Sequence, residues 1–409
     1  MDDYRWLVSD EGGRWLAEAA ATSRPLVPLT NSLRRSLTAE RTHLVLEQVA
    51  LRRHAADKFS QAAQMFFTRP LLEQATDECI AACKSLRFPR GGVVADLCCG
   101  LGGDLLALGR RGAAVGSDRS AIAALLAEAN CRACGVTGAM VRVQDAAAAS
   151  VGAVAAWHLD PDRRAAGRRT TQLAHYEPGP PVISRLLGDN PRGAVKLAPA
   201  AAVPQQWAEQ AELGWIGSRG ECRQQVAWFG DLARCPGQRS ATIADAADGA
   251  SFTCRGLPDR EPLVAAAVGR YVYEPNATIL AARLTGEIAA RHQLLAIAAG
   301  VGYLTADQLV QSPALACFEV TDVLPFDEKR VQALLRQRRI GRLEVKKRAV
   351  RVLPEQWQKR FAGRGEHAGV LIITPQHGSA IAVLARRVPD ENEAHSGFGQ
   401  SAPDPCPSA

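Results

Sequence analysis

The stretch VVADLCCGLGGD, residues 93–104, decides the fold class of this 409-residue chain. A short apolar run ends on Asp96, and three glycines follow within the next seven residues. Glycine lets a backbone approach a ligand closely, and the N-terminus of a helix behind such a turn carries a partial positive charge. The stretch therefore predicts a strand that runs into a turn holding a nucleotide-like ligand.

The sequence on either side alternates short apolar strands with alanine-rich helices from about residue 86. One helix is predicted in DLLALGRRG and one in SAIAALLAEANCRACG with Ser120 as its N-cap, while Glu221 in SRGECRQQVAWF is expected to open another. This alternation predicts a mostly parallel sheet with helices on both faces. Ligands of such sheets bind beyond the carboxyl ends of the strands. The strands are expected in GVVADL, AAVGSD, VRVQD, VAAWHLDP, GAVKLA, GWIGS and SATIAD.

Composition and the spacing of apolar residues divide the rest of the chain into further regions. Residues 1–85 show apolar spacing of three and four and are predicted to be helical, ahead of an α/β domain over residues 86–265. Residues 266–388 predict a smaller C-terminal α/β module. Residues 389–409, rich in Pro, Gly, Ser and Asp, predict a disordered tail.

Composition points to the reducing interior of a cell. No apolar run reaches the roughly 18 to 20 residues that cross a bilayer, and the N-terminus lacks a signal-peptide pattern, so we expect a cytoplasmic protein without a membrane partner. Eleven scattered cysteines do not form a disulfide framework. The CxxC of Cys131 and Cys134 is interpreted as a helix end capped by Gly135, with zinc as the alternative, so no metal is expected. The sequence does not indicate an oligomeric state.

The glycine turn favours one of two cofactor classes. The dinucleotide pattern G-x-G-x-x-G would fall on Cys98, Gly100 and Gly103, with its first glycine missing. The S-adenosylmethionine pattern, D/E-x-G-x-G-x-G, falls on Asp96, Cys98, Gly100 and Gly102 and departs only at Cys98. The turn therefore favours S-adenosylmethionine over a nicotinamide cofactor.

Acids also end the next three predicted strands. Asp118 is placed to accept the ribose hydroxyls, Asp145 to meet the adenine amino group, and Asp160 with Pro161 to face the transferred methyl. Any single acid could instead cap a helix or turn. Four acids at successive strand ends, counting Asp96, favour a ligand site.

Residues 93–230 resemble the class I S-adenosylmethionine-dependent methyltransferases, and DLCCGLGGD is similar to the DxFCGxGGN turn of trimethylguanosine synthases. The chain as a whole resembles bacterial methyltransferase-like proteins with a C-terminal THUMP-like domain. The resemblance implies a Rossmann-like seven-stranded sheet and places Asp104 with the cofactor-binding residues. The segment FFTRPLLEQAT ahead of the turn is similar to one that the trimethylguanosine synthases carry. The whole-chain resemblance covers roughly residues 45–388, in the segments KFSQAAQMFFT, DLCCGLGGDLLAL, LDPDRR, VKLAPA, SRGECRQQVAWFG, YVYEPNATILAARL and VLPFDEKRVQALLRQRRIGRLEVKKRAV.

The resemblance implies direct methyl transfer at LDPDRR. Related enzymes that methylate exocyclic amines carry D/N-P-P-aromatic, whereas this chain keeps Asp160 and Pro161 but continues with Asp162 and Arg163. Arg163 and Arg164 suit a phosphate or carboxylate, because guanidinium contacts either in a bidentate manner. Trp157 and His158 are interpreted as strand packing, and Lys196 as either a cleft residue or a surface residue. Covalent catalysis by Cys98 or Cys99 is disfavoured, because no histidine lies near them in sequence.

A basic run in the C-terminal module indicates an anionic partner. Residues 329–348 contain nine basic side chains and one acid, which suits a nucleic-acid backbone. THUMP domains in other enzymes bind RNA, so the resemblance implies an RNA methyltransferase. The alternatives are a methyltransferase of a small molecule or protein, and a non-catalytic RNA-binding protein that keeps the cofactor fold. The candidate RNA-binding residues are Arg338, Arg339, Lys346, Lys347 and Arg348.

Overall fold

The computed structural model describes residues 1–22, 25–165, 168–245, 251–351, 353–361 and 365–389. The chain divides into two compact units: one comprises Met1–Leu213, Gln224–Pro236 and Ala244–Ala250, and the other Gly214–Arg223, Gly237–Ile243 and Ser251–Ala409. Residues 390–409 of the predicted tail lie outside the described residues. In the described part of the chain, no helix is both long and apolar enough to cross a membrane.

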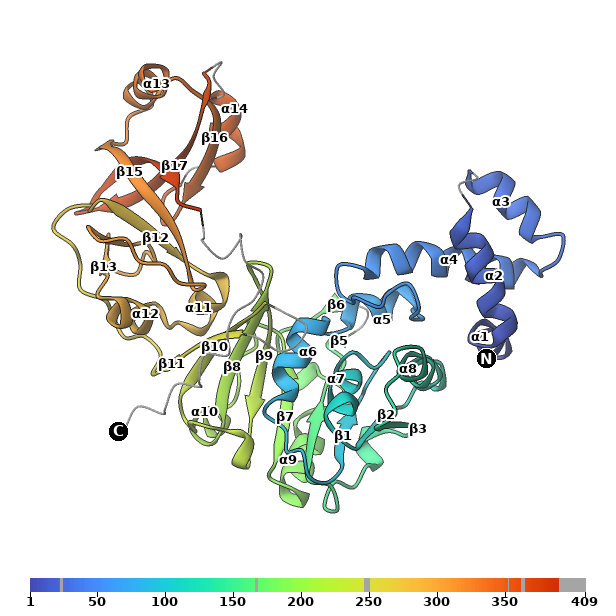
Figure 1. The fold of residues 1–409 in the computed structure, drawn as a ribbon. Coiled ribbons are helices and arrows are strands. Elements are labelled where there is room, and N and C mark those ends of the chain that lie inside the picture. The colour runs from blue at the N-terminus through green and yellow to red at the C-terminus, as the bar shows by residue number, and fades with distance from the viewer. Residues whose placement is uncertain (23–24, 166–167, 246–250, 352, 362–364, 390–409) are drawn as a thin grey trace. The chain divides into compact units, whose positions relative to one another are not determined.

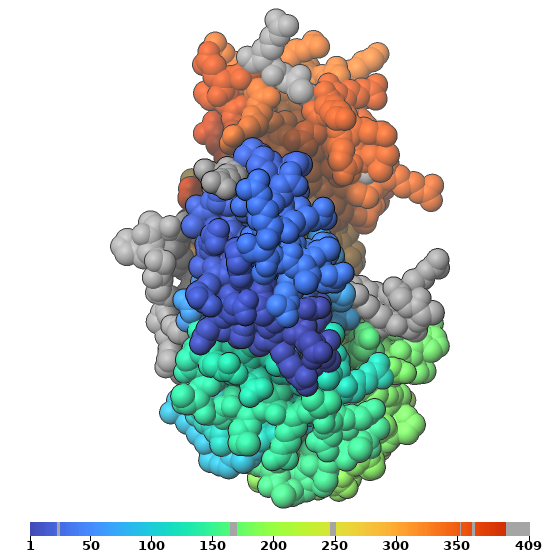
Figure 2. Space-filling model, turned by 90° about the vertical axis from the view of Figure 1, so that its right-hand side faces the viewer, coloured from blue at the N-terminus to red at the C-terminus, as the bar shows by residue number. Residues whose placement is uncertain are grey.

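The first unit begins with helices, as the sequence predicts. Polar side chains start several of them by accepting a backbone N–H, as Thr38 does from Arg41 and Asp77 from Ile80. Apolar side chains such as Leu16 and Val45 share a core with Leu126 of a later helix. The first four helices of the chain therefore share a core with that later helix, and Figure 2 shows the blue N-terminal residues against teal ones. These helices are α1 (Asp2–Leu7), α2 (Asp10–Ala21), α3 (Leu26–Leu33), α4 (Ala39–Ala55), α5 (Arg69–Gln74) and α6 (Glu78–Ser85).

One sheet carries the cofactor pattern (Figure 1). Its order is β11-β10-β8-β9-β7-β4-β1-β2-β3. The pairs β1–β2, β1–β4, β2–β3 and β4–β7 are parallel, which confirms the predicted parallel core, whereas β7–β9 is antiparallel. The strands are β1 (Val94–Leu97), β2 (Ala114–Asp118), β3 (Ala139–Val143), β4 (Ala156–Leu159), β7 (Gly193–Leu197), β8 (Glu212–Ser218), β9 (Glu221–Trp228), β10 (Arg239–Ala244) and β11 (Ser251–Gly256).

The sheet differs from the prediction in its strand count, nine instead of seven. Glu221 begins strand β9 and not a helix, so that prediction was wrong. The physical reason is the turn before it, where Arg219 and Gly220 both have positive φ, of 50° and 76°. Two such residues form the two-residue turn that returns a strand as a hairpin. The other unpredicted strand, β11, extends the sheet beyond β10.

The connections of the first unit place helices beside the strands. Helix α7 packs against β1 and β2, and α8 packs against β2 and β3. Gly135, with φ of 66°, follows the end of α8, so the CxxC forms the predicted helix end. These helices are α7 (Gly103–Arg111), α8 (Ala121–Ala133), α9 (Pro180–Asp189) and α10 (Gln205–Gln210), with 3₁₀ turns η1 (Ala146–Ala148), η2 (Leu173–His175) and η3 (Gly230–Leu232) and the short strands β5 (Arg164–Ala165) and β6 (Arg168–Arg169).

The second unit contains the C-terminal α/β module. Its sheet has the order β13-β14-β12-β15-β18-β17-β16. Leu343 and Leu371 of this sheet share a core with Val331 and Leu335 of α13, so α13 covers one face. The elements are β12 (Tyr271–Pro275), α11 (Ala277–Ala282), α12 (Thr285–His292), β13 (Leu295–Ala296), β14 (Leu304–Ala306), β15 (Leu315–Pro325), α13 (Glu328–Gln337), β16 (Ile340–Lys347), α14 (Pro354–Arg360), β17 (His367–Gln376) and β18 (Ser379–Arg387).

Candidate functional site

The turn after β1 adopts the backbone of a glycine loop throughout. Gly100 and Gly102 have φ of 56° and 90°, and Gly102 stands at the N-cap of α7. Cys98, the one departure from the S-adenosylmethionine pattern, also has a left-handed φ of 59°. A side chain in that region costs roughly 1–2 kcal/mol. The turn keeps its shape at Cys98 despite that cost, so the departure is one of side chain and not of backbone.

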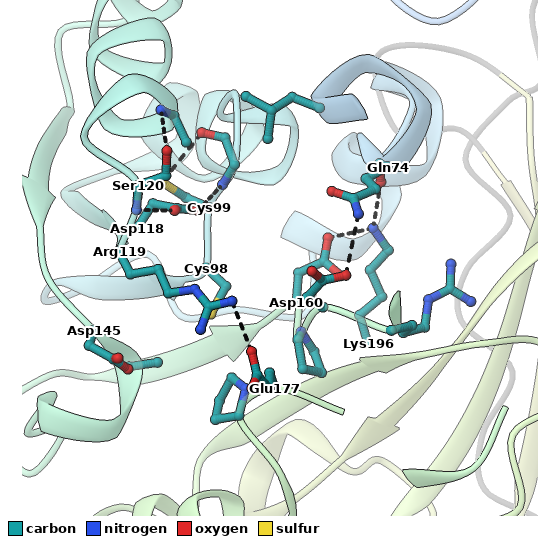
Figure 3. A pocket seen from close by; sticks show the side chains of 18 of the residues that line it. Gln74, Cys98, Cys99, Asp118, Arg119, Ser120, Asp145, Asp160, Glu177 and Lys196 are labelled. Atoms are coloured by element: carbon teal, nitrogen blue, oxygen red, sulfur yellow. Dashed lines mark hydrogen bonds and ion pairs between the residues drawn. The ribbon is translucent and has the colours of Figure 1, made fainter. Parts of the chain in front are cut away.

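A cavity of about 480 Å³ opens at the carboxyl ends of β1, β2, β3, β4 and β7 (Figure 3). This is the edge where ligands of open α/β sheets bind. Its size suits a nucleoside-sized ligand. Residues from five strand ends and from the N-terminal helical segment line it, including Gln74, Cys98, Gly100, Asp118, Asp145, Asp160 and Lys196.

Seven of the ten residues predicted to serve in catalysis or cofactor binding line this cavity: Cys98, Gly100, Asp118, Asp145, Asp160, Pro161 and Arg163. Asp96, Gly102 and Asp104 do not. The Asp96 side chain is 1% exposed and bonded to His158, while the Asp104 carboxylate is paired with Lys84. The side chain of Arg164 lies outside the described residues. Whether the lining residues bind a ligand stays a prediction.

Asp118 joins the end of β2 to the glycine turn. Its Oδ2 accepts a hydrogen bond from the backbone N–H of Gly100 at 3.0 Å, and its Oδ1 accepts one from Ser120 at 2.8 Å. A carboxylate has about four acceptor sites, so each oxygen can still accept a ligand hydroxyl. Asp145 caps η1 by accepting from Ala147 at 2.8 Å and also faces the cavity. Asp118 and Asp145 therefore each accept a hydrogen bond from a nearby backbone N–H and also line the cavity. Capping and a place at the ligand site, which the sequence left as alternatives, are compatible here.

The charges around the cavity oppose an anionic ligand. Five carboxylates line it against three cationic side chains, and two of the cations are already paired. Arg119 Nη2 lies 2.8 Å from Glu177 Oε2, and Lys196 Nζ lies 2.6 Å from Asp160 Oδ2. An excess of negative charge repels a pyrophosphate and attracts a cationic sulfonium. The donor set therefore fits S-adenosylmethionine. The carboxylates are Asp118, Asp145, Asp160, Asp162 and Glu177, and the cations Arg119, Arg163 and Lys196.

The N-terminal helical segment supplies a wall that the sequence did not assign to the site. Leu71, Gln74, Ala75 and Thr76 line the cavity. Lys196 Nζ donates to the Gln74 carbonyl at 3.3 Å and to Thr76 Oγ1 at 3.0 Å. The resemblance includes the segment FFTRPLLEQAT, which was the available signal. The contacts of this helical segment with β7 join residues about 120 positions apart in the sequence. A local sequence pattern therefore cannot predict them.

A buried row of polar groups lies behind the cavity. His158 Nδ1 lies 2.7 Å from Asp96 Oδ1, and His158 Nε2 lies 3.2 Å from Lys84 Nζ. Lys84 Nζ in turn lies 2.7 Å from Asp104 Oδ1. Burial raises the pKa of the Asp96 carboxyl, with the neighbouring Asp104 charge adding to the rise and the contact with His158 opposing it. His158 is therefore packed in the strand, as predicted, and is also hydrogen-bonded on both ring nitrogens.

Asp104 connects this row to the cavity. Its Oδ2 accepts a hydrogen bond of 2.7 Å from Thr76 Oγ1, the same hydroxyl that accepts from Lys196. Burial alone would raise the pKa of the Asp104 carboxyl, but the charges of Lys84, His158 and Lys196 hold that pKa well below its usual range. The row is thus continuous from Asp96 to Asp160.

The two cysteines of the turn are poor nucleophiles. Burial raises the pKa of the Cys98 thiol far above its ordinary value, and the nearby charge of Asp118 raises it further. Burial does the same to the pKa of Cys99. Because the thiolate is the reactive form, this environment agrees with the interpretation of both cysteines as small residues of a tight turn. Within the described part of the chain, no group of three or more His, Cys, Asp or Glu side chains is arranged to hold a metal ion.

The residues predicted to bind RNA lie around β16 and largely have acid partners. Distances between the nitrogen and the carboxylate oxygen are 2.7 Å for Arg338–Asp322, 3.4 Å for Arg339–Glu366, 2.7 Å for Lys346–Glu274 and 3.2 Å for Arg348–Glu274. Lys347 instead donates to the Val350 carbonyl at 3.4 Å. In the folded protein, these acids therefore offset much of the positive charge that the basic run has in the sequence.

A sheet with a parallel core, a glycine turn after its first strand, acids after the following strands and a cavity suited to a cation together define the class of S-adenosylmethionine-dependent methyltransferases. Comparison with known proteins agrees. An uncharacterized S-adenosylmethionine-dependent methyltransferase of Mycobacterium tuberculosis, found in strains CDC 1551 / Oshkosh and H37Rv, is 30% identical over 352 residues, 83% of this chain and 94% of that protein. The chain therefore belongs to the S-adenosylmethionine-dependent methyltransferase family, and S-adenosylmethionine is its cofactor.

Other comparisons concern the fold and the terminal regions. A crystal structure of a protein assigned as a methyltransferase from Porphyromonas gingivalis W83 has a TM-score of 0.76 and 19% identity, covering 92% of this chain and 97% of that one. Residues 315–387 match the family described as THUMP domain-like. Residues 1–55 match a domain of unknown function. The fold class and the C-terminal module predicted from the sequence are confirmed, whereas the likeness of the turn to trimethylguanosine synthases stays a prediction.

Proposed function

We propose that this methyltransferase acts on RNA, with the cofactor in the cavity and the methyl acceptor beside Asp160. The observation that carries the proposal is that one cavity joins Asp118, Asp145 and Asp160 from three separate strand ends. Bound S-adenosylmethionine supplies an electrophilic methyl group on positively charged sulfur. Cys98, Gly100, Asp118 and Asp145 are the residues proposed to hold it.

The remaining cavity residues handle the acceptor. Asp160 is 26% exposed, and no hydrogen bond to its Oδ1 is present among the described residues, so this oxygen can accept an N–H or O–H of the substrate. Pro161 fixes the backbone after Asp160. Arg163 lies at the same cavity and suits a substrate phosphate. Aligning the acceptor in this way is the main contribution that a protein makes to such a transfer.

RNA is the proposed substrate because of the C-terminal module. That module matches the THUMP domain-like family, and THUMP domains in other enzymes bind RNA. Among its predicted contact residues, Arg339 pairs with Glu366 in an exposed ion pair, with side chains 67% and 71% exposed. Exposed pairs stabilise a protein by roughly 0–1 kcal/mol, so a phosphate can replace the carboxylate of this pair at small cost. We place the domain boundaries near residues 86 and 266.

The test is transfer of labelled methyl from S-adenosylmethionine to fractionated RNA from a strain that lacks the gene. The wild-type protein is expected to label one RNA fraction, and Asp160→Ala to reduce the rate by at least about 100-fold. Filter binding is expected to show salt-sensitive RNA affinity that falls when Lys346, Lys347 and Arg348 are neutralised together. RNA binding without transfer to any extract would instead support a non-catalytic RNA-binding protein.

A second candidate substrate class rests on the lining of the cavity. No aromatic side chain is among the described lining residues, whereas enzymes that methylate a base amine stack the base on an aromatic ring. This observation favours a small molecule or a protein as the acceptor. Labelling of a protein or metabolite extract, with none of RNA, would establish that class and overturn the RNA proposal.

A further inference from the structure

Lys196 and Asp160 form a close ion pair at the methyl-acceptor end of the cavity (Figure 3). The Lys196 side chain, at the end of β7, is 6% exposed, and its Nζ lies 2.6 Å from Asp160 Oδ2. Asp160 is also tied to β1, because its backbone N–H donates to the Leu97 carbonyl at 3.1 Å. The carboxylate is thus held by contacts from two neighbouring strand ends.

The ammonium of Lys196 is itself held in place by several groups. It donates to Thr76 Oγ1 at 3.0 Å and to the Gln74 carbonyl at 3.3 Å. Thr76 then donates to Asp104, whose other oxygen pairs with Lys84. Side chains of opposite charge alternate along this row, and a buried charge without such a partner would be strongly destabilising. The arrangement leaves Lys196 little freedom to leave Asp160.

We propose that Lys196 is a positioning residue: a resident counter-ion that holds the Asp160 carboxylate in place and cancels its charge where the acceptor binds. This inference rests on the proposed function. The pair presents Asp160 Oδ1 as a fixed hydrogen-bond acceptor with little net charge around it. The methyl acceptor that suits such a site is a neutral N–H or O–H group, because a protonated amine would gain no attraction from a pair without net charge.

The charge balance can be measured without knowing the acceptor. S-adenosylmethionine carries a positive sulfur, whereas S-adenosylhomocysteine lacks the methyl and has a neutral one. Isothermal titration of both ligands gives the preference for the cationic over the neutral form. Lys196→Met leaves Asp160 uncompensated and is expected to raise that preference about tenfold, while Asp160→Asn leaves Lys196 uncompensated and is expected to lower it about tenfold. A residue with only a structural role would weaken both ligands alike.

Further variants isolate the pair. The double variant Lys196→Met with Asp160→Asn is expected to return the preference to within about twofold of wild type, because both charges are gone. Thr76→Val removes the hydroxyl but no charge, so it is expected to shift the preference for S-adenosylmethionine over S-adenosylhomocysteine by less than about twofold. Lys359→Met makes the same substitution at an exposed lysine of α14, outside both the cavity and the predicted RNA-binding residues, and serves as the matched control.

The outcomes separate this inference from the proposed function. Shifts of the two single variants in the same direction, or of less than about twofold in both, would overturn the role of Lys196. Should Lys196→Met fail to fold, Lys196→Gln takes its place. Lys196→Gln is then expected to raise the preference for S-adenosylmethionine over S-adenosylhomocysteine, and Asp160→Asn to lower it. Opposite shifts without methyl transfer to RNA would support the counter-ion and overturn only the RNA substrate. Binding of neither ligand to the wild type would overturn both.

Discussion

The substitution Asp104→Asn tests whether Asp104, at the start of α7, stabilises the fold through a buried ion pair or binds the cofactor. The sequence places Asp104 with the cofactor-binding residues, but the structure ties its carboxylate to Lys84 at 2.7 Å and to Thr76 at 2.7 Å. The two paired side chains, Lys84 and Asp104, are only 2% and 10% exposed. Asparagine keeps the shape and removes the charge, so the variant leaves the Lys84 ammonium buried without its counter-ion.

The expected loss is large because the pair is buried. Removing one partner of a buried ion pair costs about 3–5 kcal/mol. For a domain of roughly 150–250 residues each kcal/mol lowers the melting temperature by about 2–4 °C, so we expect a fall of about 6–20 °C. The ammonium of Lys84 also approaches His158 at 3.2 Å, so local rearrangement cannot easily return it to water.

The assay combines urea unfolding, thermal unfolding and titration with S-adenosylmethionine. Asp189→Asn is the matched control, because its pair with Arg185 is about 40% exposed on each side chain and is expected to be worth at most about 1 kcal/mol. Adding Lys84→Met to Asp104→Asn is expected to recover part of the loss, since the unpaired charge is then gone. An Asp104→Asn protein within about 1 kcal/mol of wild type, but with cofactor affinity reduced more than about tenfold, would refute the anchor and support the ligand interpretation.

Three further predictions follow from the site. Because the charge of Lys84 holds the pKa of Asp104 below its usual range despite burial, the stability from this carboxylate is present above about pH 4 and lost as the pH falls further. The unfolding free-energy gap between wild type and Asp104→Asn should therefore shrink below about pH 4 in urea titrations, and a gap that stays constant to pH 2 would contradict this. Burial raises the pKa of the Cys98 thiol, so iodoacetamide at pH 8 should leave Cys98 unmodified by mass spectrometry, and Cys98→Ala should retain methyl transfer within about threefold; a loss above about tenfold would indicate a chemical role. Asp118→Ala should weaken S-adenosylmethionine binding by about 10- to 100-fold in calorimetry, because hydrogen bonds to a carboxylate are worth about 1.5–3 kcal/mol, and unchanged affinity would remove Asp118 from the cofactor site.

The sequence could predict what local pattern controls. Neighbouring residues predict strand β1, the turn at Gly100 and Gly102, and the capped start of α8. The structure contains each of these features. The acids Asp118 and Asp160 meet at one edge because parallel strands align their carboxyl ends. That part of the site needs no knowledge of distant contacts.

Contacts between distant residues explain what the sequence could not predict. Asp104 reads as part of the glycine turn, but its partner Lys84 comes from the preceding helical segment. The basic run around β16 reads as free positive charge, but Glu274, which lies 72 residues before Lys346, pairs with two of its members. Strand β9, one of the two unpredicted strands, was missed because two residues, Arg219 and Gly220, form the turn of a hairpin there.

The buried row gives the N-terminal helices a part in the integrity of the catalytic domain itself. A fragment that starts at residue 86 would keep every strand of the cofactor-binding sheet and every acid of its strand ends. It would nevertheless lack Gln74, Thr76 and Lys84. Asp104 would then be without its two partners, and Lys196 would keep only Asp160 of its three. Attempts to isolate the methyltransferase domain by trimming the chain at that point should therefore yield an unstable protein. We therefore expect the shortest stable fragment to begin well ahead of its glycine turn.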